Sequence, residues 1–220
     1  MSRTAVRHSL TEMKKLLIAT SLEPATLRGE RPKAALAVLD PRQKDLLRDL
    51  NTSLAKPSEK HDPLSLFTRF DPEELTLSGK VVKTRGRMTF EAGDQPGTVD
   101  VHADYTFVYP VVRVGTGADA EVARTIVRRT LTGTLYDPAK YLATGGKLNL
   151  TYYADDLYNS ACSVYDGYLH PQFAGESVGT APTGPAADPY DRSKSLPTAA
   201  PGTSGQVGER EAECGVVSRT

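Results

Sequence analysis

The residues of this sequence best suited to chemistry include a histidine that precedes an aspartate by two positions. An imidazole beside a carboxylate can act as a general base, and His102 and Asp104 have the residue types for this role. The same pattern is typical of cross-strand charge pairing, with Arg85 and Arg87 expected on the neighbouring strand. We favour charge pairing and therefore predict no catalytic residue.

Arg129 is a charged residue that strand alternation would direct into the protein core. Val127 and Leu131 share its parity, and a charge that is buried without partners is costly. One explanation is a β-bulge that shifts the strand register, which we favour. The other is a pocket at the open end of a curved sheet, lined by Tyr105, Arg129 and Tyr152.

The sequence offers little support for cofactor, metal or serine-hydrolase chemistry. His-Glu-x-x-His and Cys-x-x-Cys do not occur, and two cysteines cannot form a four-thiolate zinc site. The glycine pairs at 115–117 and 145–146 fit hairpin turns, whereas a dinucleotide site needs a turn from strand to helix. Gly-x-Ser-x-Gly occurs once, at 175–179, within the segment expected to be a disordered tail, whereas a nucleophile elbow needs a turn from strand to helix. We expect no metal and no cofactor, and we expect both cysteines to be free thiols.

Charge is balanced over the whole chain, with 27 Lys and Arg residues and 27 Asp and Glu residues. A balanced charge does not favour nucleic-acid binding, so we expect none. A local basic face is still predicted in the sheet, from Lys83, Arg85, Arg87, Arg124 and Arg128. It could bind an anionic partner, but Asp100 and Asp104 lie on the intervening strand, which favours an ordinary solvated face.

The first third of the chain has the periodicity of helices. Apolar residues three and four apart predict a helix over 6–22, and a short helix is expected over 34–39. Asp40 and Pro41 have the types of an N-cap and a first helical residue, so a further helix is expected from there to Ala55. The punctuated connector that follows contains four apolar residues that we expect to pack against the domain: Leu64, Leu66, Phe67 and Phe70.

From Leu75 onward the apolar pattern has a period of two, which predicts strands. We expect four successive antiparallel strands, the first two joined by a turn at 93–97. The predicted register places Phe90 opposite Val99, Arg87 opposite His102 and Arg85 opposite Asp104. The last two strands are expected over 122–136 and 147–153.

These elements predict an α+β domain in which N-terminal helices pack on a curved, four-stranded antiparallel sheet. We expect an N-terminal helix and linker over 1–33, the α+β domain over 34–173 and a disordered tail over 174–220. The tail is rich in Pro, Gly, Ala, Ser and Thr, and it has too little apolar surface to offset the entropy of ordering. No apolar run approaches the roughly 20 residues that span a bilayer.

Three segments of the strand region have a characteristic sequence: 82–90, 104–110 and 123–130. Together with Cys162 and the segment 167–173, they resemble extracytoplasmic domains of uncharacterised, membrane-anchored actinobacterial proteins. The resemblance covers roughly 34–173, and the order of helices and sheet is similar to the NTF2-like, or cystatin-like, fold. The resemblance implies this fold. It assigns no catalytic residues, because the family offers no catalytic motif that could be matched to this sequence.

The resemblance also implies a location and a kind of partner. Members of this family carry a membrane anchor before the domain, and this sequence contains none. We expect a cytoplasmic protein from the sequence as written, or an extracytoplasmic, membrane-associated one where the gene start is truncated. Contact with a membrane would come only through a partner or the missing anchor.

Function is predicted only in outline, because NTF2-like folds host enzymes, ligand binders and assembly modules. We expect a non-enzymatic accessory or protein-interaction domain associated with the cell envelope, with an unknown protein partner. The alternative is a small-ligand binder or an enzyme that uses the concave side of the sheet.

Overall fold

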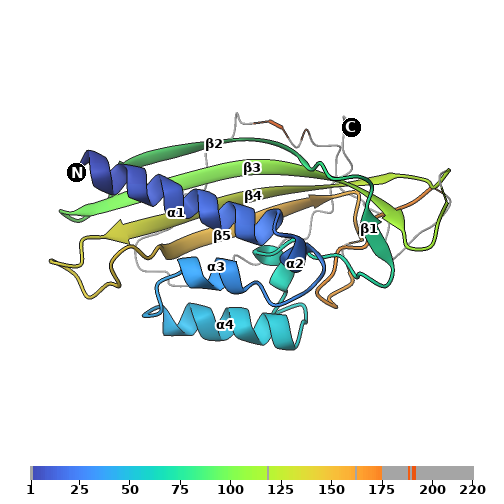
Figure 1. Cartoon of the computed structure of the whole chain (residues 1–220). Helices are drawn as coiled ribbons and strands as arrows, with labels where there is room; N and C mark the ends of the chain where they lie inside the picture. The colour runs from blue at the N-terminus through green and yellow to red at the C-terminus, as the bar shows by residue number, and fades with distance from the viewer. Residues whose placement is uncertain (1, 118, 162, 175–187, 189, 192–220) are drawn as a thin grey trace.

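The computed structural model describes residues 2–117, 119–161, 163–174, 188, 190 and 191. These residues form an α+β fold with helices first and an antiparallel sheet after them (Figure 1). The helices are α1 (Arg3–Ser21), α2 (Pro24–Leu27), α3 (Lys33–Val38), α4 (Lys44–Ala55) and the 3-10 helix η1 (Pro63–Ser65). The strands are β1 (Leu75–Leu77), β2 (Lys83–Ala92), β3 (Thr98–Arg113), β4 (Ala123–Tyr136) and β5 (Asn149–Tyr158). Most of the tail predicted over 174–220, and both cysteines, lie outside the described residues.

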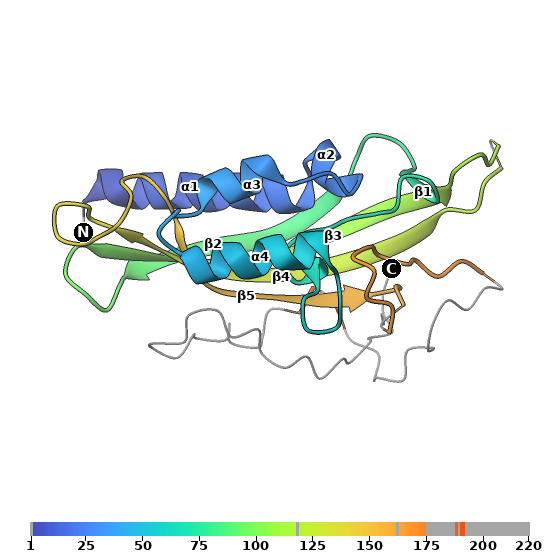
Figure 2. The same cartoon turned by 90° about the horizontal axis from the view of Figure 1, so that it is seen from below.

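The helix expected over 6–22 is confirmed as α1, which begins three residues earlier than predicted. It begins earlier because the Ser2 side chain accepts a hydrogen bond from the Ala5 backbone amide at 3.1 Å and so caps the helix. Met13, Leu16 and Leu17 form its buried stripe and pack into the same hydrophobic core as the strands. Helices α1 and α3 lie beside each other on one side of the sheet (Figure 2).

The predicted capping role of Asp40 is wrong, because α4 begins only at Lys44. Asp40 lies on the connection from α3 and bonds instead to the hairpin between β4 and β5. Its carboxylate accepts hydrogen bonds from the backbone amide of Thr144 at 2.9 Å and from the Thr144 hydroxyl at 2.8 Å. The aspartate therefore joins two distant segments rather than starting a helix.

The connector between α4 and β1 packs against the domain as predicted. Leu64, Leu66, Phe67 and Phe70 are all buried. Asp62 accepts a hydrogen bond from the Leu64 amide at 2.8 Å, which caps the short η1 helix. The connector thus contributes four apolar side chains to the core in spite of its many turn residues.

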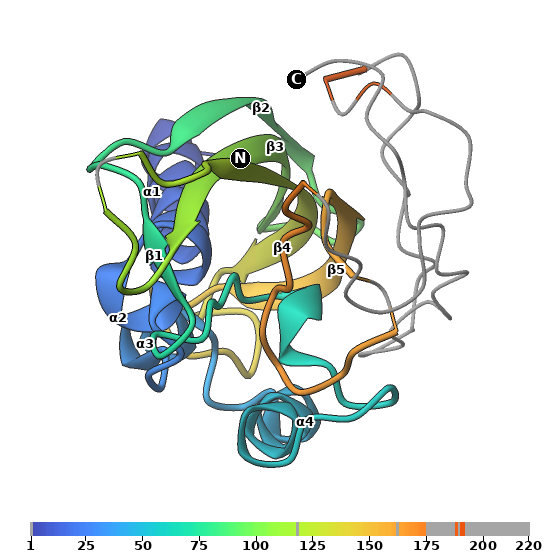
Figure 3. The same ribbon diagram turned by 90° about the vertical axis from the view of Figure 1, so that its right-hand side faces the viewer.

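The sheet has five strands, one more than predicted, in the order β1-β3-β4-β5 with β2 also paired to β3. The additional strand, β1, is three residues long and pairs Leu75 with Arg113. Both β1 and β2 lie along the edge of β3 that faces away from β4. The view along the strands in Figure 3 shows the helices gathered on one side of this sheet.

The register predicted for the first hairpin is wrong by two residues. Phe90 pairs with Val101, and Arg87 pairs with Asp104 instead of His102. The turn lies later than expected because Gly97 has a positive φ of 96° and Gly93 already bonds to Thr98, with the amide donating at 3.2 Å. An even shift leaves each side chain on its predicted face.

The strand β5 contains a bulge opposite Thr132 and Gly133 of β4. Leu150 pairs with Gly133 and Tyr152 pairs with Thr132, so Thr151 is the extra residue. Gln43 covers the outer edge of β5 here, since its side-chain amide donates to the Leu150 carbonyl at 2.9 Å and accepts from the Leu150 amide at 2.8 Å. Beyond the bulge, the side chains of β5 exchange faces.

Candidate functional site

Arg129 faces the helix side of the sheet and is fully buried. It pairs with Tyr105 on β3 and with Asp155 on β5. Its guanidinium donates to the carbonyl oxygens of Leu64 at 3.2 Å and of Ser65 at 2.9 Å. The favoured prediction of a bulge that shifts Arg129 is wrong, because the bulge lies in β5 opposite Thr132 and Gly133 and leaves Arg129 in register. The side chain stays in the core, where it binds the backbone of the η1 connector.

A buried polar network extends from Arg129 toward the end of α1. The guanidinium also donates to the Thr68 hydroxyl at 3.2 Å, and the Tyr109 hydroxyl lies 3.2 Å from the same oxygen. Tyr109 donates to the carbonyl of Ser21 at 2.8 Å. Burial raises the pKa of Tyr109 above its usual range, so the phenol stays protonated as a donor. The network ties β3 and β4 to the connector and to α1.

The structure brings together two of the three predicted pocket residues. Tyr105 lies directly opposite Arg129, is half-buried and stacks on Phe107 with ring centroids 6.4 Å apart. Tyr152 pairs with Thr132 and therefore lies on the other face of the sheet, because the bulge reverses the alternation. Tyr153, which the sequence did not single out, packs against the core in its place.

The five predicted basic residues share the face of the sheet opposite the helices, which we call the outer face. The acidic Asp104 lies within this face, is fully buried and pairs directly with Arg87. Arg128 donates to both carboxylate oxygens of Asp104, each at 2.9 Å. This hydrogen bonding raises the pKa of Arg128, although burial acts in the opposite direction. One of the five basic residues, Arg128, thus has its charge neutralised by the buried Asp104.

A hydroxyl, an imidazole and a carboxylate form a chain on the same face. His102 Nδ1 lies 3.0 Å from the Thr132 hydroxyl, and His102 Nε2 lies 3.0 Å from Glu91 Oε1. The order matches that of a nucleophile, a base and an orienting acid. However, Thr132 is only 6% exposed, and the Glu91 side chain is 66% exposed, so the hydroxyl is shielded while the acid is solvated. The arrangement equally serves as a cross-strand polar contact.

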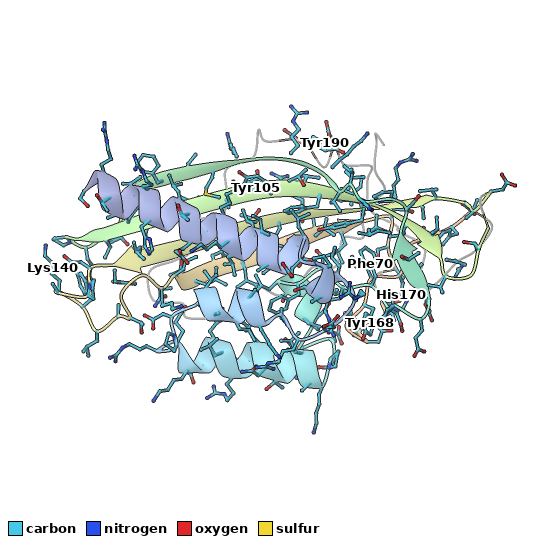
Figure 4. The ribbon with its side chains drawn as sticks, in the orientation of Figure 1. Phe70, Tyr105, Lys140, Tyr168, His170 and Tyr190 are labelled. Atoms are coloured by element: carbon cyan, nitrogen blue, oxygen red, sulfur yellow. The ribbon has the colours of Figure 1, made fainter. Side chains whose placement is uncertain are left out.

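A second buried arginine, which sequence reasoning missed, lies at the end of the sheet nearest β1. Arg69 donates to the Gly29 carbonyl at 2.5 Å, and its guanidinium carbon lies 5.0 Å from the centre of the Tyr168 ring. Burial lowers the pKa of Arg69, while Tyr168 and Asp166 oppose that change. Figure 4 shows Tyr168 and His170 close together, and His170 Nε2 lies 2.9 Å from Asp166. No local pattern in the sequence could have indicated this contact, because Arg69 and Tyr168 lie far apart in the chain.

Within the described ranges, no group of three His, Cys, Asp or Glu side chains is arranged to hold a metal ion. Among the same residues, no helix is both long enough and apolar enough to cross a bilayer. Comparison with family models, with curated proteins and with solved structures yields no match to this chain. The function must therefore be argued from the contacts of the residues themselves.

Proposed function

We propose that this chain is a non-enzymatic protein-interaction domain that binds its partner along β2, at the open edge of the sheet. The main support for this proposal is the role of Arg129, the residue that would have lined the pocket of a ligand binder. Its guanidinium donates to two backbone carbonyls and the Thr68 hydroxyl, and the side chain has no exposed surface. This arginine binds the protein's own connector, which favours an interaction domain over a ligand pocket at this position.

The edge formed by β2 has the properties of a docking strand. Among the described residues, β2 pairs only with β3, and nine of its ten residues are exposed. An exposed edge strand offers a row of backbone donors and acceptors to a further strand. The opposite edge differs, because Gln43 already satisfies the amide and carbonyl of Leu150 on β5.

The proposal extends to architecture and location. N-terminal helices on one side of an antiparallel sheet support an NTF2-like arrangement, with the expected curvature of the sheet as its finer feature. Association with an actinobacterial cell envelope rests on the sequence resemblance alone. An experimental structure of the full chain would check the first part, and fractionation of the native cells would check the second.

Photo-crosslinking in cells tests the proposed function. A photoreactive residue replaces Thr89, which lies on the exposed part of β2, and the matched control replaces Arg48, an exposed residue of α4. We expect a product of discrete mass from position 89 and none from position 48. Equal labelling from both positions, or from neither, would contradict binding along β2.

A second candidate function is supported by the chain of Glu91, His102 and Thr132. The 3.0 Å contacts on both sides of the imidazole suit acyl transfer to the threonine hydroxyl. Hydrolysis of an activated ester tests it, with Thr132→Val and His102→Gln as variants. A rate that falls at least about tenfold in both variants would favour an enzyme, and equal rates would remove this candidate.

A further inference from the structure

We propose that the partner of β2 is β2 of a second copy, with the two strands antiparallel about a two-fold axis at Met88. This inference rests on the proposed function and names the partner. A two-fold interface uses the same surface twice, so residue i must suit residue j in both directions. The strand β2 meets this condition in hydrogen bonding, in charge and in shape.

Hydrogen bonding limits the alignments that two copies of β2 can adopt. The Gly93 amide donates to the Thr98 carbonyl at 3.2 Å, which makes these two residues a hydrogen-bonded pair of the β2–β3 ladder. In antiparallel strands such pairs alternate, so the odd-numbered residues of β2 bond toward β3. The even-numbered residues, including Met88, present their amides and carbonyls outward. An axis at Met88 pairs even residues with even residues over 84–92.

Charge disfavours two of the neighbouring axes. With the axis at Met88, Arg85 lies opposite Glu91 of the second copy, and the pair occurs twice. An axis at Gly86 would place Arg85 opposite Arg87, and an axis at Arg87 would place that residue opposite itself. Like charges directly opposite are destabilising. An axis at Thr89 also places opposite charges together, Arg87 with Glu91, but it shortens the paired region to 86–92.

Shape supports the same axis independently. Gly86 has no side chain, and a Cβ there would overlap the Asp104 carbonyl oxygen and the Tyr105 ring. Phe90 is 49% exposed on the same face of the strand. The axis at Met88 places Phe90 of each copy opposite Gly86 of the other, beside the Tyr105 ring, which is marked in Figure 4. The Phe90 ring would therefore pack on the Tyr105 ring that fills the space over Gly86, and half-buried Met88 meets itself.

Single cysteines in the full chain test the alignment. They are introduced at Met88, Arg87 or Thr89 in a Cys162→Ser, Cys214→Ser background, and Thr84→Cys is the matched control. Opposite residues of a hydrogen-bonded pair have Cα atoms about 5.5 Å apart, which a disulfide can span. We expect Met88→Cys alone to form a covalent dimer under mild oxidation. Stronger crosslinking at Arg87 or Thr89, or none at any position, would overturn the proposal.

Charge reversal tests the same pairing without chemical modification. Arg85→Glu and Glu91→Arg each turn two attractive pairs into repulsive ones, and we expect each to weaken self-association at least about tenfold. The double variant restores opposite charges and should recover most of the affinity, as measured by sedimentation equilibrium. A double variant as weak as both single variants would overturn the pairing of Arg85 with Glu91.

The two proposals fail in different ways. A protein that stays monomeric in sedimentation, but whose position 89 crosslinks to a product other than a dimer, overturns this inference and leaves the proposed function standing. The test also distinguishes a second copy from the chain's own segment 192–220 as the occupant of the edge. Crosslinking of position 89 within one copy would show that this segment covers the edge, and would overturn the inference also.

Discussion

Buried polar residues of this protein hold segments that lie far apart in the sequence. Arg129 of β4 binds the backbone of the connector at Leu64 and Ser65, and Tyr109 of β3 binds the end of α1 at Ser21. A buried charge is tolerated when several acceptors surround it, and removal of the charge leaves those acceptors without donors. The consequences of substitution therefore depend on the partners left behind.

Replacement of Arg129 by Ala is expected to lower the free energy of unfolding by about 3 kcal/mol or more, because hydrogen bonds to a buried charged group are lost. Urea unfolding followed by circular dichroism measures this change. The control is Arg124→Ala on the same strand, which is exposed and should change stability by no more than about 0.5 kcal/mol. Equal effects of the two substitutions would show that Arg129 does not anchor the connector.

Gly86 lies in β2 where the Tyr105 ring of β3 leaves no room for a side chain. We expect Gly86→Ala to destabilise the protein by roughly 1–3 kcal/mol through overpacking. Gly117 is the matched control, because nothing lies within 4 Å of a Cβ built there. Thermal unfolding of both variants measures the difference. A neutral Gly86→Ala would mean that Tyr105 can move away at little cost.

Connections between helices and strands also make hydrogen bonds to segments far away in the sequence. Asp40 follows α3 and binds the hairpin between β4 and β5, and the Asp40 amide donates to the Leu148 carbonyl at 2.9 Å. Burial by itself would raise the pKa of Asp40, but hydrogen bonds from Arg42 and Thr144 more than offset it. The net effect is a pKa below the ordinary value.

A lowered pKa links Asp40 to the acid stability of the fold. A carboxyl whose pKa is lower in the folded state contributes stability above its unfolded pKa, and the contribution disappears as the pH falls through the folded pKa. We expect Asp40→Asn to cost about 1–3 kcal/mol at pH 7 and progressively less in acid. Urea unfolding between neutral pH and pH ~3 measures this convergence.

The control for the Asp40 experiment is Glu59→Gln, which changes an exposed carboxyl between α4 and η1. We expect its stability to follow that of the unchanged protein at every pH. A difference between Asp40→Asn and the unchanged protein that stays constant across the pH range would contradict the proposed linkage, because only a loss of packing would then remain.

The whole molecule is organised around a single core that α1 shares with the sheet. Met13 and Leu16 have no exposed surface, and they belong to the same buried cluster as Val101 and Phe107 of β3. Helix α1 also contacts α3 and β4. A boundary at residue 33 would therefore pass through a contiguous packed interior.

Deletion of residues 1–33 tests how far the expected domain over 34–173 can fold without α1. We expect the shortened chain to lose cooperative unfolding and the dispersion of its amide NMR spectrum, because the apolar face of the sheet would become exposed. Substitution of the exposed Lys14 by Ala in the full chain is the control and should leave both signals intact. A cooperative transition in the shortened chain would support the boundary instead.

Local patterns in the sequence determined the α+β class, the first helix, the burial of Phe67 in the connector and the face of each residue in the first hairpin. Alternation along the strand also assigned Arg129 to the core face, but the bulge that we favoured as its explanation does not occur at this residue. These features need only the periodicity of the chain and the polarity of its side chains.

Tertiary structure decided the features that depend on partners distant in the chain. The strand β1 has only three residues, which is too short to show the two-residue alternation of a strand. It forms because β3 extends beyond the part of it that pairs with β2. The bulge at Thr151 moved Tyr152 to the outer face, and Asp40 bound Thr144 rather than a helix end. Local sequence cannot specify these choices, because each one is stabilised by hydrogen bonds or packing that exist only after the segments have come together.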